Sequence, residues 1–142
     1  MTRLAAIACF LFLVSRAIAG YDVHITRRSD WSDKSGPPIT LAEWKKLVAS
    51  DAEMRLDNFA EAATSAGKKI SIASDGSAVW TKWSEHGKNG SRAWFFYLDG
   101  DVRVKNPDKE ILGKMFRIAR KLGAKLQGDD GEFYDAHGEV LK

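Results

Sequence analysis

Two amphipathic helical segments, separated by a run of short strand-like segments, most constrain how this 142-residue chain can fold. The first covers residues 41–50, and four apolar residues recur on one helical face: Leu41, Trp44, Leu47 and Val48. In front of it, Thr40 and Glu43 match the S/T-x-x-E pattern of a capping box, in which each side chain accepts a hydrogen bond from the other's main chain. The pattern predicts a helix over residues 41–50.

The second helical segment follows Asn106, which we expect to cap a helix whose first residue is Pro107. Its apolar residues form one stripe: Ile111, Leu112, Met115, Ile118, Ala119 and Leu122. Its cations fall outside that stripe, and we expect them to be solvated: Lys109, Lys114, Arg117, Arg120 and Lys121. Gly123 is suited to end the helix, because glycine adopts the left-handed conformation without a Cβ clash.

The other segments have the composition of short strands. Alternating or β-prone runs predict strands at 21–28, 68–73, 77–83, 92–98, 101–105, 124–127 and 131–135. Residues 92–98 carry apolar side chains on both faces of the predicted strand, which indicates a central strand. Asp75-Gly76 and Asp99-Gly100 each separate two β-prone runs, so both predict hairpin turns. Residues 54–64 fit a strand over their first half or a second helical piece, and we favour the strand.

This order of elements predicts an α+β fold. We expect a single domain over residues 21–142, with a mostly antiparallel sheet of about five to six strands and two helices packed on one face. A chain of this size buries well over half of the surface that its unfolded form exposes, so one hydrophobic core is enough to hold it.

Residues 1–20 have the layout of a secretory signal. Arg3 precedes an apolar run from Leu4 to Val14, and Ala17-Ile18-Ala19 fits the small-x-small pattern of a cleavage site. A start codon assigned too early is the alternative. The run is too short for a permanent membrane span. With the signal, the protein is expected in the periplasm or outside the cell, and without it in the cytoplasm.

Removal of this signal changes the chemistry of the chain. The segment contains Cys9, the one cysteine, so the mature chain has no disulfide and no thiol nucleophile. It also contains two arginines and no acid, so Lys plus Arg falls from 22 to 20 against 19 acids, and the net charge falls from +3 to +1. The charge therefore makes no strong case for nucleic-acid binding.

The acidic stretch 126–139 suggests a cation site, but its spacing does not fit one. Counted from Asp129, the third, fifth and sixth positions of an EF-hand loop would be Gly131, Phe133 and Tyr134, where two acids and a glycine are needed. The three histidines are too far apart in sequence for a zinc motif: His24, His86 and His137. No glycine-rich phosphate-binding motif is present. We expect no metal and no cofactor, and interpret the stretch as a solvated turn between two strands.

His24 is the one candidate for acid–base chemistry. It lies two positions after Asp22, on the same face of a predicted strand, so a carboxylate–imidazole pair is geometrically possible. No G-x-S-x-G motif accompanies it. A small hydrolase that uses His24 with nearby carboxylates is therefore an alternative function, and we assign no catalytic residue.

Tryptophans and cations mix in the region that follows the first Asp-Gly pair. Trp80 and Trp83 cannot both face inward on a regular strand, so we expect one of them at the surface. The glycine-bearing loop 84–91 adds polar and cationic residues beside it. The candidate binding residues are Trp83, His86, Lys88 and Arg92. A binder of glycans or single-stranded nucleic acid through Trp83 and residues 86–92 is a second alternative function.

Several motifs together resemble a small uncharacterised bacterial α+β domain family. They are YDVHITRR near the start, I-x-L-x-EW at 39–44, VKNPD at 104–108 and LGAKLQGDDGE at 122–132, so the resemblance covers nearly all of residues 21–135. The resemblance implies a shared architecture and no established activity. We expect a non-enzymatic module that binds another protein, such as a bacterial immunity or inhibitor protein that binds a toxin or an enzyme.

Overall fold

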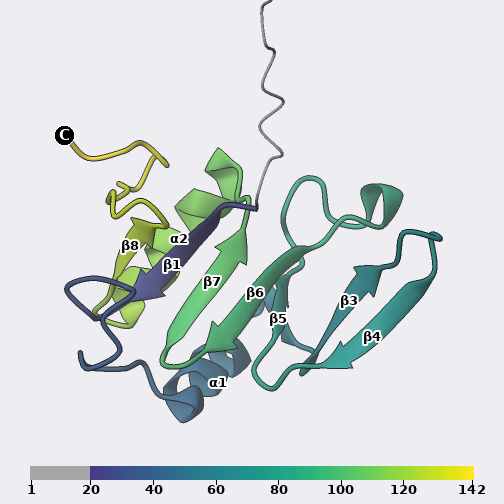
Figure 1. Ribbon diagram of the computed structural model, residues 1–142, viewed down its shortest axis with the longest axis horizontal. Helices are drawn as coiled ribbons and strands as arrows, with labels where there is room; N and C mark the ends of the chain where they lie inside the picture. Colours follow the sequence, from purple (N-terminus) through teal and green to yellow (C-terminus); the bar gives the residue numbers. More distant parts are fainter. Residues whose placement is uncertain (1–19) are drawn as a thin grey trace, which may run out of the picture.

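The computed structural model describes residues 20–142 and shows an α+β domain (Figure 1). Six strands form an antiparallel sheet in the order β2-β5-β6-β7-β1-β8. Their bounds are β1 (Asp22–Thr26), β2 (Met54–Leu56), β5 (Ala78–Trp80), β6 (Ala93–Leu98), β7 (Asp101–Lys105) and β8 (Lys125–Gly128). Two further strands, β3 (Phe59–Ala63) and β4 (Lys69–Ala73), pair only with each other. The predicted fold class is confirmed. The predicted signal lies outside the described residues, apart from Gly20.

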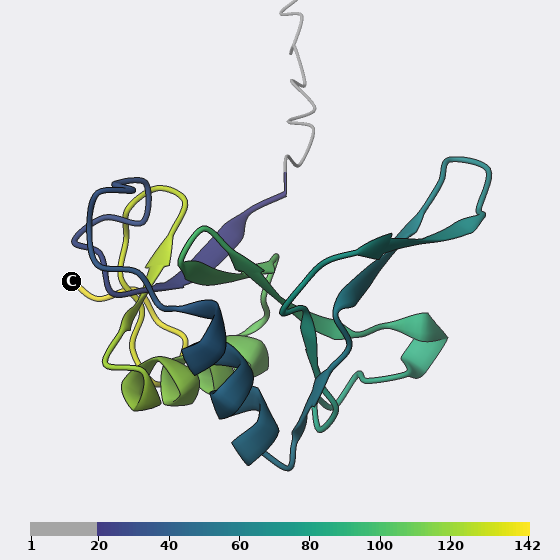
Figure 2. The same cartoon turned by 90° about the horizontal axis from the view of Figure 1, so that it is seen from below.

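Both helices, α1 (Leu41–Ser50) and α2 (Lys109–Lys121), lie on one face of the six-stranded sheet (Figure 2). The core fills the space between them and the sheet. Its largest fully buried side chains include Trp44 of α1, Phe95 of β6 and Met115 of α2. Within residues 20–142 neither helix has the length and apolar character to cross a membrane. The opposite side of the sheet, called here the helix-free face, carries the side chains considered below.

Both helix starts depend on side-chain caps, and one of the two predicted caps is wrong. Thr40 and Glu43 form the predicted capping box of α1. In α2 the cap is Asp108, whose carboxylate accepts the main-chain N–H of Ile111, and not Asn106. Asn106 has a positive φ of 48° and its side chain accepts the N–H of Tyr21, so it turns the chain before the helix. Gly123 follows the helix with a positive φ, as predicted.

The predicted hairpin at Asp75-Gly76 is also wrong, because β4 and β5 do not pair. Instead β2 pairs with β5 and β3 pairs with β4, so the segments 54–63 and 69–80 are the two arms of one long hairpin. Its turn lies at residues 64–68, where the Thr64 N–H donates to the Lys68 carbonyl. Between the paired regions one arm has two residues, 57–58, and the other has four, 74–77. Such an unequal count interrupts the ladder and bends a hairpin.

The bend turns the outer part of this hairpin away from the sheet. Figure 2 shows β3 and β4 rising on the side opposite the helices. The Asp75-Gly76 turn is held against the body instead: the Gly76 carbonyl accepts the Trp44 indole N–H at 2.6 Å, and the Gly76 N–H donates to the Asn58 side chain at 3.0 Å. The β3–β4 pair has no third strand beside it in the described chain.

Strand β1 is buried on both faces, whereas the alternation in its sequence predicts one solvated face. His24 and Thr26 point away from the helices and are nevertheless 4% and 0% exposed. The loop at residues 27–40 covers them, and the Trp31 ring stacks on the His24 ring with 4.2 Å between centroids. Sequence alternation records polarity, and it does not reveal that a distant loop folds over a polar strand face.

Lys114, predicted to be solvated, is buried at 4% exposure. Its ammonium group lies 2.7 Å from an Asp51 carboxylate oxygen and 3.3 Å from one of Glu53, in the turn after α1. Burial of a lysine requires such partners, because an unpaired charge is costly in the protein interior. Helical spacing alone places Lys114 off the apolar stripe and gives no information about the second element that packs there.

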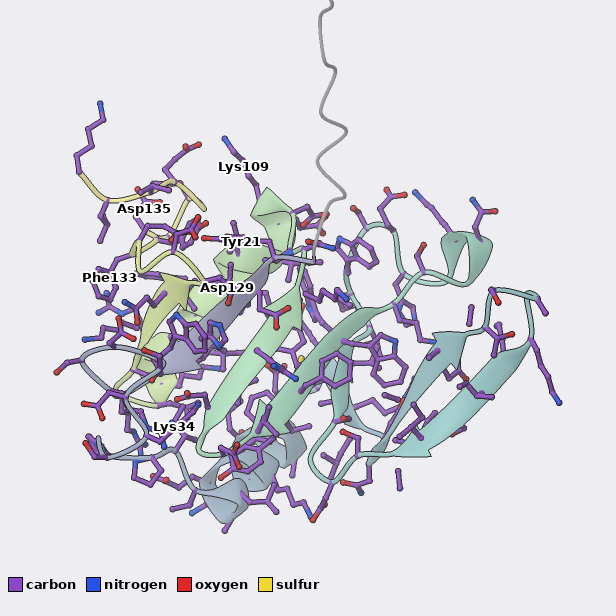
Figure 3. The ribbon with its side chains drawn as sticks, viewed as in Figure 1. Tyr21, Lys34, Lys109, Asp129, Phe133 and Asp135 are labelled. Atoms are coloured by element: carbon purple, nitrogen blue, oxygen red, sulfur yellow. The ribbon has the colours of Figure 1, made fainter. Side chains whose placement is uncertain are left out.

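The acidic C-terminal stretch turns back on β8 as predicted, but it contains no regular strand at 131–135. Single bridges join Gln127 to Phe133 and Tyr134 to Val140. Several carboxylates have protein partners and are not simply solvated. Asp129 binds His24 and the Asp22 N–H, and Glu132 accepts the Tyr21 and Tyr134 hydroxyls. Figure 3 shows Asp129 beside Tyr21 near the start of β1.

Candidate binding site

The helix-free face carries a row of aromatic side chains near the β3–β4 hairpin. Trp94 and Phe96 alternate with core residues along β6, and their rings lie 6.1 Å apart at an interplanar angle of 16°. Phe59, the first residue of β3, meets Trp94 edge-on with 6.0 Å between centroids. All three side chains are half-buried. They form an apolar patch where the hairpin leaves the sheet.

The outer hairpin carries exposed aliphatic residues on the ribbon face opposite the one that carries Phe59. Pairing places Ala60 opposite Ile72, and Ala62 opposite Ile70, so these four side chains share one face of the β3–β4 ribbon. Ile70 and Ile72 are 42% and 52% exposed. Full burial of a wholly exposed isoleucine is favourable by roughly 1.5–3 kcal/mol, and these half-exposed side chains would gain about half of that on further burial. The ribbon thus presents an apolar face that nothing in residues 20–142 covers.

A cavity of about 350 Å³ lies where β6 and β7 separate. The two strands pair from Leu98–Asp101 as far as Phe96–Arg103 and no further. Beyond that point β6 continues alongside β5, and β7 continues alongside β1. Figure 1 shows the two ribbons diverging toward the end of β7. The cavity is lined by Trp83, Arg92, Ala93, Trp94, Phe96, Val104, Lys105, Asn106, Asp108 and Ile111.

Trp83 is positioned by the start of α2. Its indole N–H donates to the Asp108 carboxylate at 2.9 Å, while the other oxygen of Asp108 caps the helix. The next residue, Ser84, donates its main-chain N–H to Glu110 at 2.9 Å. These bonds hold the loop after β5 against the helix and set the indole as one wall of the cavity.

The structure brings together two of the four predicted binding residues. Trp83 and Arg92 line the cavity, whereas His86 and Lys88 do not. Lys88 is the first residue of the short 3₁₀ helix η1 (Lys88–Gly90) and pairs with Glu85 at 3.2 Å. Trp83 is half-buried, whereas Trp80, the other tryptophan of the predicted strand, faces the core at 4% exposure. The predicted strand 77–83 ends at Trp80, so strand alternation does not decide the position of Trp83, which packs against the core while part of it remains exposed.

The cavity has a net positive charge. Within residues 20–142, neither Arg92 nor Lys105 has a carboxylate within ion-pair distance, although other cations of the helix-free face do: Arg55 pairs with Asp57, and Arg103 lies 3.5 Å from Asp22. The one carboxylate in the lining, Asp108, already accepts two hydrogen bonds. Two cations therefore face an aromatic cavity without an anionic partner from the described chain.

His24 lies in a second, smaller cavity of about 210 Å³, lined by His24, Trp31, Lys34, Leu98, Asp99, Asp101 and Arg103. The predicted carboxylate–imidazole pair forms with Asp129, at 2.8 Å, and not with Asp22. Asp101 is 3% exposed and lies 2.9 Å from a guanidinium nitrogen of the equally buried Arg28. The lining includes no serine, threonine or cysteine. The half-buried Asp129 and the buried Asp101 thus each join distant segments of the fold.

No group of three or more His, Cys, Asp or Glu side chains within residues 20–142 is placed to hold a metal ion.

Sequence reasoning missed Phe59, Trp94, Phe96 and Lys105 as surface residues. Alternation in AWFFYL was the available signal for two of them, since Trp94 and Phe96 share one face. The apolar character of the other face obscured it.

No protein-family model, no curated protein and no solved structure matches the chain.

Proposed function

We propose that this protein is a non-enzymatic binding module that recognises another protein, as bacterial immunity and inhibitor proteins do. Two apolar surfaces support this proposal most directly. One is the aromatic row of Phe59, Trp94 and Phe96. The other is the exposed face of the β3–β4 ribbon with Ile70 and Ile72, opposite the ribbon face that carries Phe59. Protein interfaces are enriched in aromatic residues and arginine, with an apolar centre and a polar rim. With the predicted export signal, the target would be a toxin or an enzyme outside the cytoplasm.

The surroundings of this surface favour a partner with acidic groups. Arg92 and Lys105 border the aromatic row and have no carboxylate partner in residues 20–142. Arg103 occupies the position directly across from Phe96 in the β6–β7 pairing. Tryptophan and arginine are the side chains that most often carry binding energy at interfaces. An acidic partner would therefore meet opposite charges at the rim of an apolar contact.

The test is capture of a partner by the immobilised protein from extracts of the cells that produce it, followed by mass spectrometry. A double variant, Ile70→Ser with Ile72→Ser, removes apolar surface without touching the core, and Lys46→Ser on exposed α1 surface is the matched control. We expect one protein to be retained by the parent and the control and to be lost at least tenfold with the hairpin variant. Equal retention by all three would contradict this interface.

Two other outcomes would favour the alternative functions. Turnover of chromogenic esters or glycosides that is abolished by His24→Ala would favour a hydrolase. Salt-sensitive retention on heparin or single-stranded DNA, without any captured protein, would favour a binder of glycans or nucleic acid.

A further inference from the structure

The cavity between β6 and β7 interrupts a hydrogen-bonded ladder. Asp99-Gly100 is a two-residue turn, so the flanking Leu98–Asp101 pair is of the hydrogen-bonded kind, and such pairs recur at every second position. Phe96–Arg103 is the next pair of this kind and is formed. Trp94–Lys105 would follow, but it is absent from the ladder. The main-chain groups of these two residues are therefore directed toward each other without being joined as a ladder pair.

The neighbouring strands explain why this interruption persists. Trp94 is paired with Val79 of β5, and Lys105 is paired with Asp22 of β1. Each strand is thus held by its outer neighbour while the two inner edges separate. Main-chain N–H and C=O groups are almost always paired in folded proteins. The opening therefore provides sites for main-chain groups that come from elsewhere.

The side chains around the opening restrict what can enter it. Trp83, Trp94 and Phe96 provide apolar walls, and Arg92 and Lys105 provide two cations without a carboxylate partner in the described chain. A volume of about 350 Å³ lies near the lower end of the roughly 300–1,000 Å³ typical of ligand cavities, so it accommodates a short segment and not a folded surface.

We propose that this opening binds an extended, acidic segment of the partner protein. The main chain of the segment pairs with the main-chain groups of Trp94, an apolar side chain packs between Trp83 and Trp94, and a carboxylate reaches Arg92 and Lys105. Strand addition of this kind takes its affinity from main-chain hydrogen bonds and its specificity from side-chain pockets. This inference rests on the proposed function and identifies the chemistry of the partner.

A nucleic-acid strand fits the same observations less well. Binding of single strands relies on a basic groove along several phosphates, with affinity that falls steeply with salt. This opening has two cations, and the chain without residues 1–20 has a net charge of only +1, from 20 cations against 19 acids. Main-chain donors and acceptors at a strand edge match a peptide more closely than a phosphate backbone.

The experiment is selection of random twelve-residue peptides on the purified protein, followed by calorimetry with the most enriched peptide. We expect Asp and Glu to be enriched, and we expect the double variant Arg92→Gln with Lys105→Gln to weaken binding at least tenfold. Arg120→Gln, an exposed cation on α2, is the matched control and should bind as the parent does. Thermal melting of each variant confirms that it is folded, and Lys105→Gln alone, at an exposed site, should still weaken binding.

Main-chain pairing has its own readout. Two peptides are compared, one N-methylated at its odd-numbered residues and one at its even-numbered residues. One of them should lose binding and the other should keep it, because successive N–H groups of a strand point in opposite directions. Hydrogen exchange of the Trp94 amide should slow when the peptide binds.

The outcomes separate this inference from the proposed function. Peptides without acidic residues, or binding that is indifferent to both the charge variant and N-methylation, would overturn the inference. If such binding, or a captured partner, still depended on Ile70 and Ile72, the proposed function would stand alone. Tighter binding of a twelve-base oligothymidine than of any peptide would overturn both.

Discussion

The imidazole of His24 and the carboxylate of Asp129, 105 positions apart in the chain, lie 2.8 Å from each other. The second oxygen of Asp129 accepts the Asp22 N–H at 2.8 Å, so one carboxylate joins the turn after β8 to the start of β1. The Trp31 ring stacks on the imidazole, with 4.2 Å between the ring centroids. Asp129 therefore links the C-terminal part of the domain to its first strand by two hydrogen bonds.

We predict that Asp129→Ala destabilises the fold by about 1–3 kcal/mol, because the buried His24 nitrogen and the Asp22 N–H lose their acceptor. The free energy of unfolding measured in urea checks this. Asp130→Ala, at the adjacent exposed position, is the control and should stay within about 0.5 kcal/mol of the parent. Equal effects at both positions would show that the pair contributes nothing.

Lys114→Ala should destabilise the protein far more than loss of an exposed cation from the same helix. The change leaves Asp51, whose side chain is 9% exposed, without its cation, and removal of one member of a buried ion pair costs about 3–5 kcal/mol. Burial alone would raise the pKa of Asp51, but hydrogen bonds from Lys114 and the Glu53 N–H hold it below its ordinary value. Arg120→Ala is the comparison, and unfolding in urea that affects both variants equally would refute this role.

Glu43 predicts a specific dependence on pH. Hydrogen bonds from Arg27 and then from Thr40 lower the pKa of its carboxyl from 4.5 to about 2. A carboxyl with a lower pKa in the folded state stabilises the fold above the unfolded-state pKa, and this contribution is lost as the pH falls toward the folded-state pKa. Glu43→Gln should therefore be less stable than the parent at pH 7, with a difference that shrinks between about pH 4.5 and pH 2.

Urea midpoints at several pH values measure that difference. The exposed Glu61→Gln on β3 is the control and should give a small difference that does not change with pH. A Glu43→Gln difference that stayed constant down to pH 2 would exclude the ion pair as its source.

Gly76 and Gly67 separate two effects of a side chain at a positive φ. Both have a left-handed backbone, with φ of 85° and 76°, which costs a non-glycine residue roughly 1–2 kcal/mol. A Cβ at Gly76 would lie 2.8 Å from Leu41 Cδ1 and 3.0 Å from Tyr97 Cβ, whereas a Cβ at Gly67 would meet nothing within 4 Å. Gly76→Ala should therefore lower the melting temperature clearly more than Gly67→Ala. Equal losses would mean that the turn at residues 74–77 moves freely away from α1.

The local elements were predictable where the deciding interactions are close in sequence. The capping box of Thr40 and Glu43, the Asp99-Gly100 turn and the end of α2 at Gly123 each depend on a few consecutive residues. The error at Asp75-Gly76 has the same origin, since an Asp-Gly pair is a local signal. The main chain of Gly76 in this turn forms hydrogen bonds with the side chains of Trp44 and Asn58, which are distant in sequence. The turn therefore does not pair β4 with β5.

The candidate site was only partly predictable, because it depends on where the strands β6 and β7 stop pairing with each other. Trp83 and Arg92 were recognisable as an aromatic and a cation near a polar loop. Lys105 and Phe96 join them only because β6 follows β5 while β7 follows β1, which opens the ladder beyond Phe96–Arg103. Strand pairing is a long-range choice, and periodicity within one strand does not report which neighbour it will follow.

The sequence by itself determined two helices, a set of antiparallel strands and the face that each helix buries, because these follow from hydrophobic period and local hydrogen bonding. Tertiary structure alone decided which polar groups are buried, among them His24 and Lys114, and where apolar side chains remain exposed, as at Ile70 and Ile72. Burial is a property of the assembled chain: a charged side chain is solvated or enclosed according to what packs beside it, and the packing partner is distant in sequence.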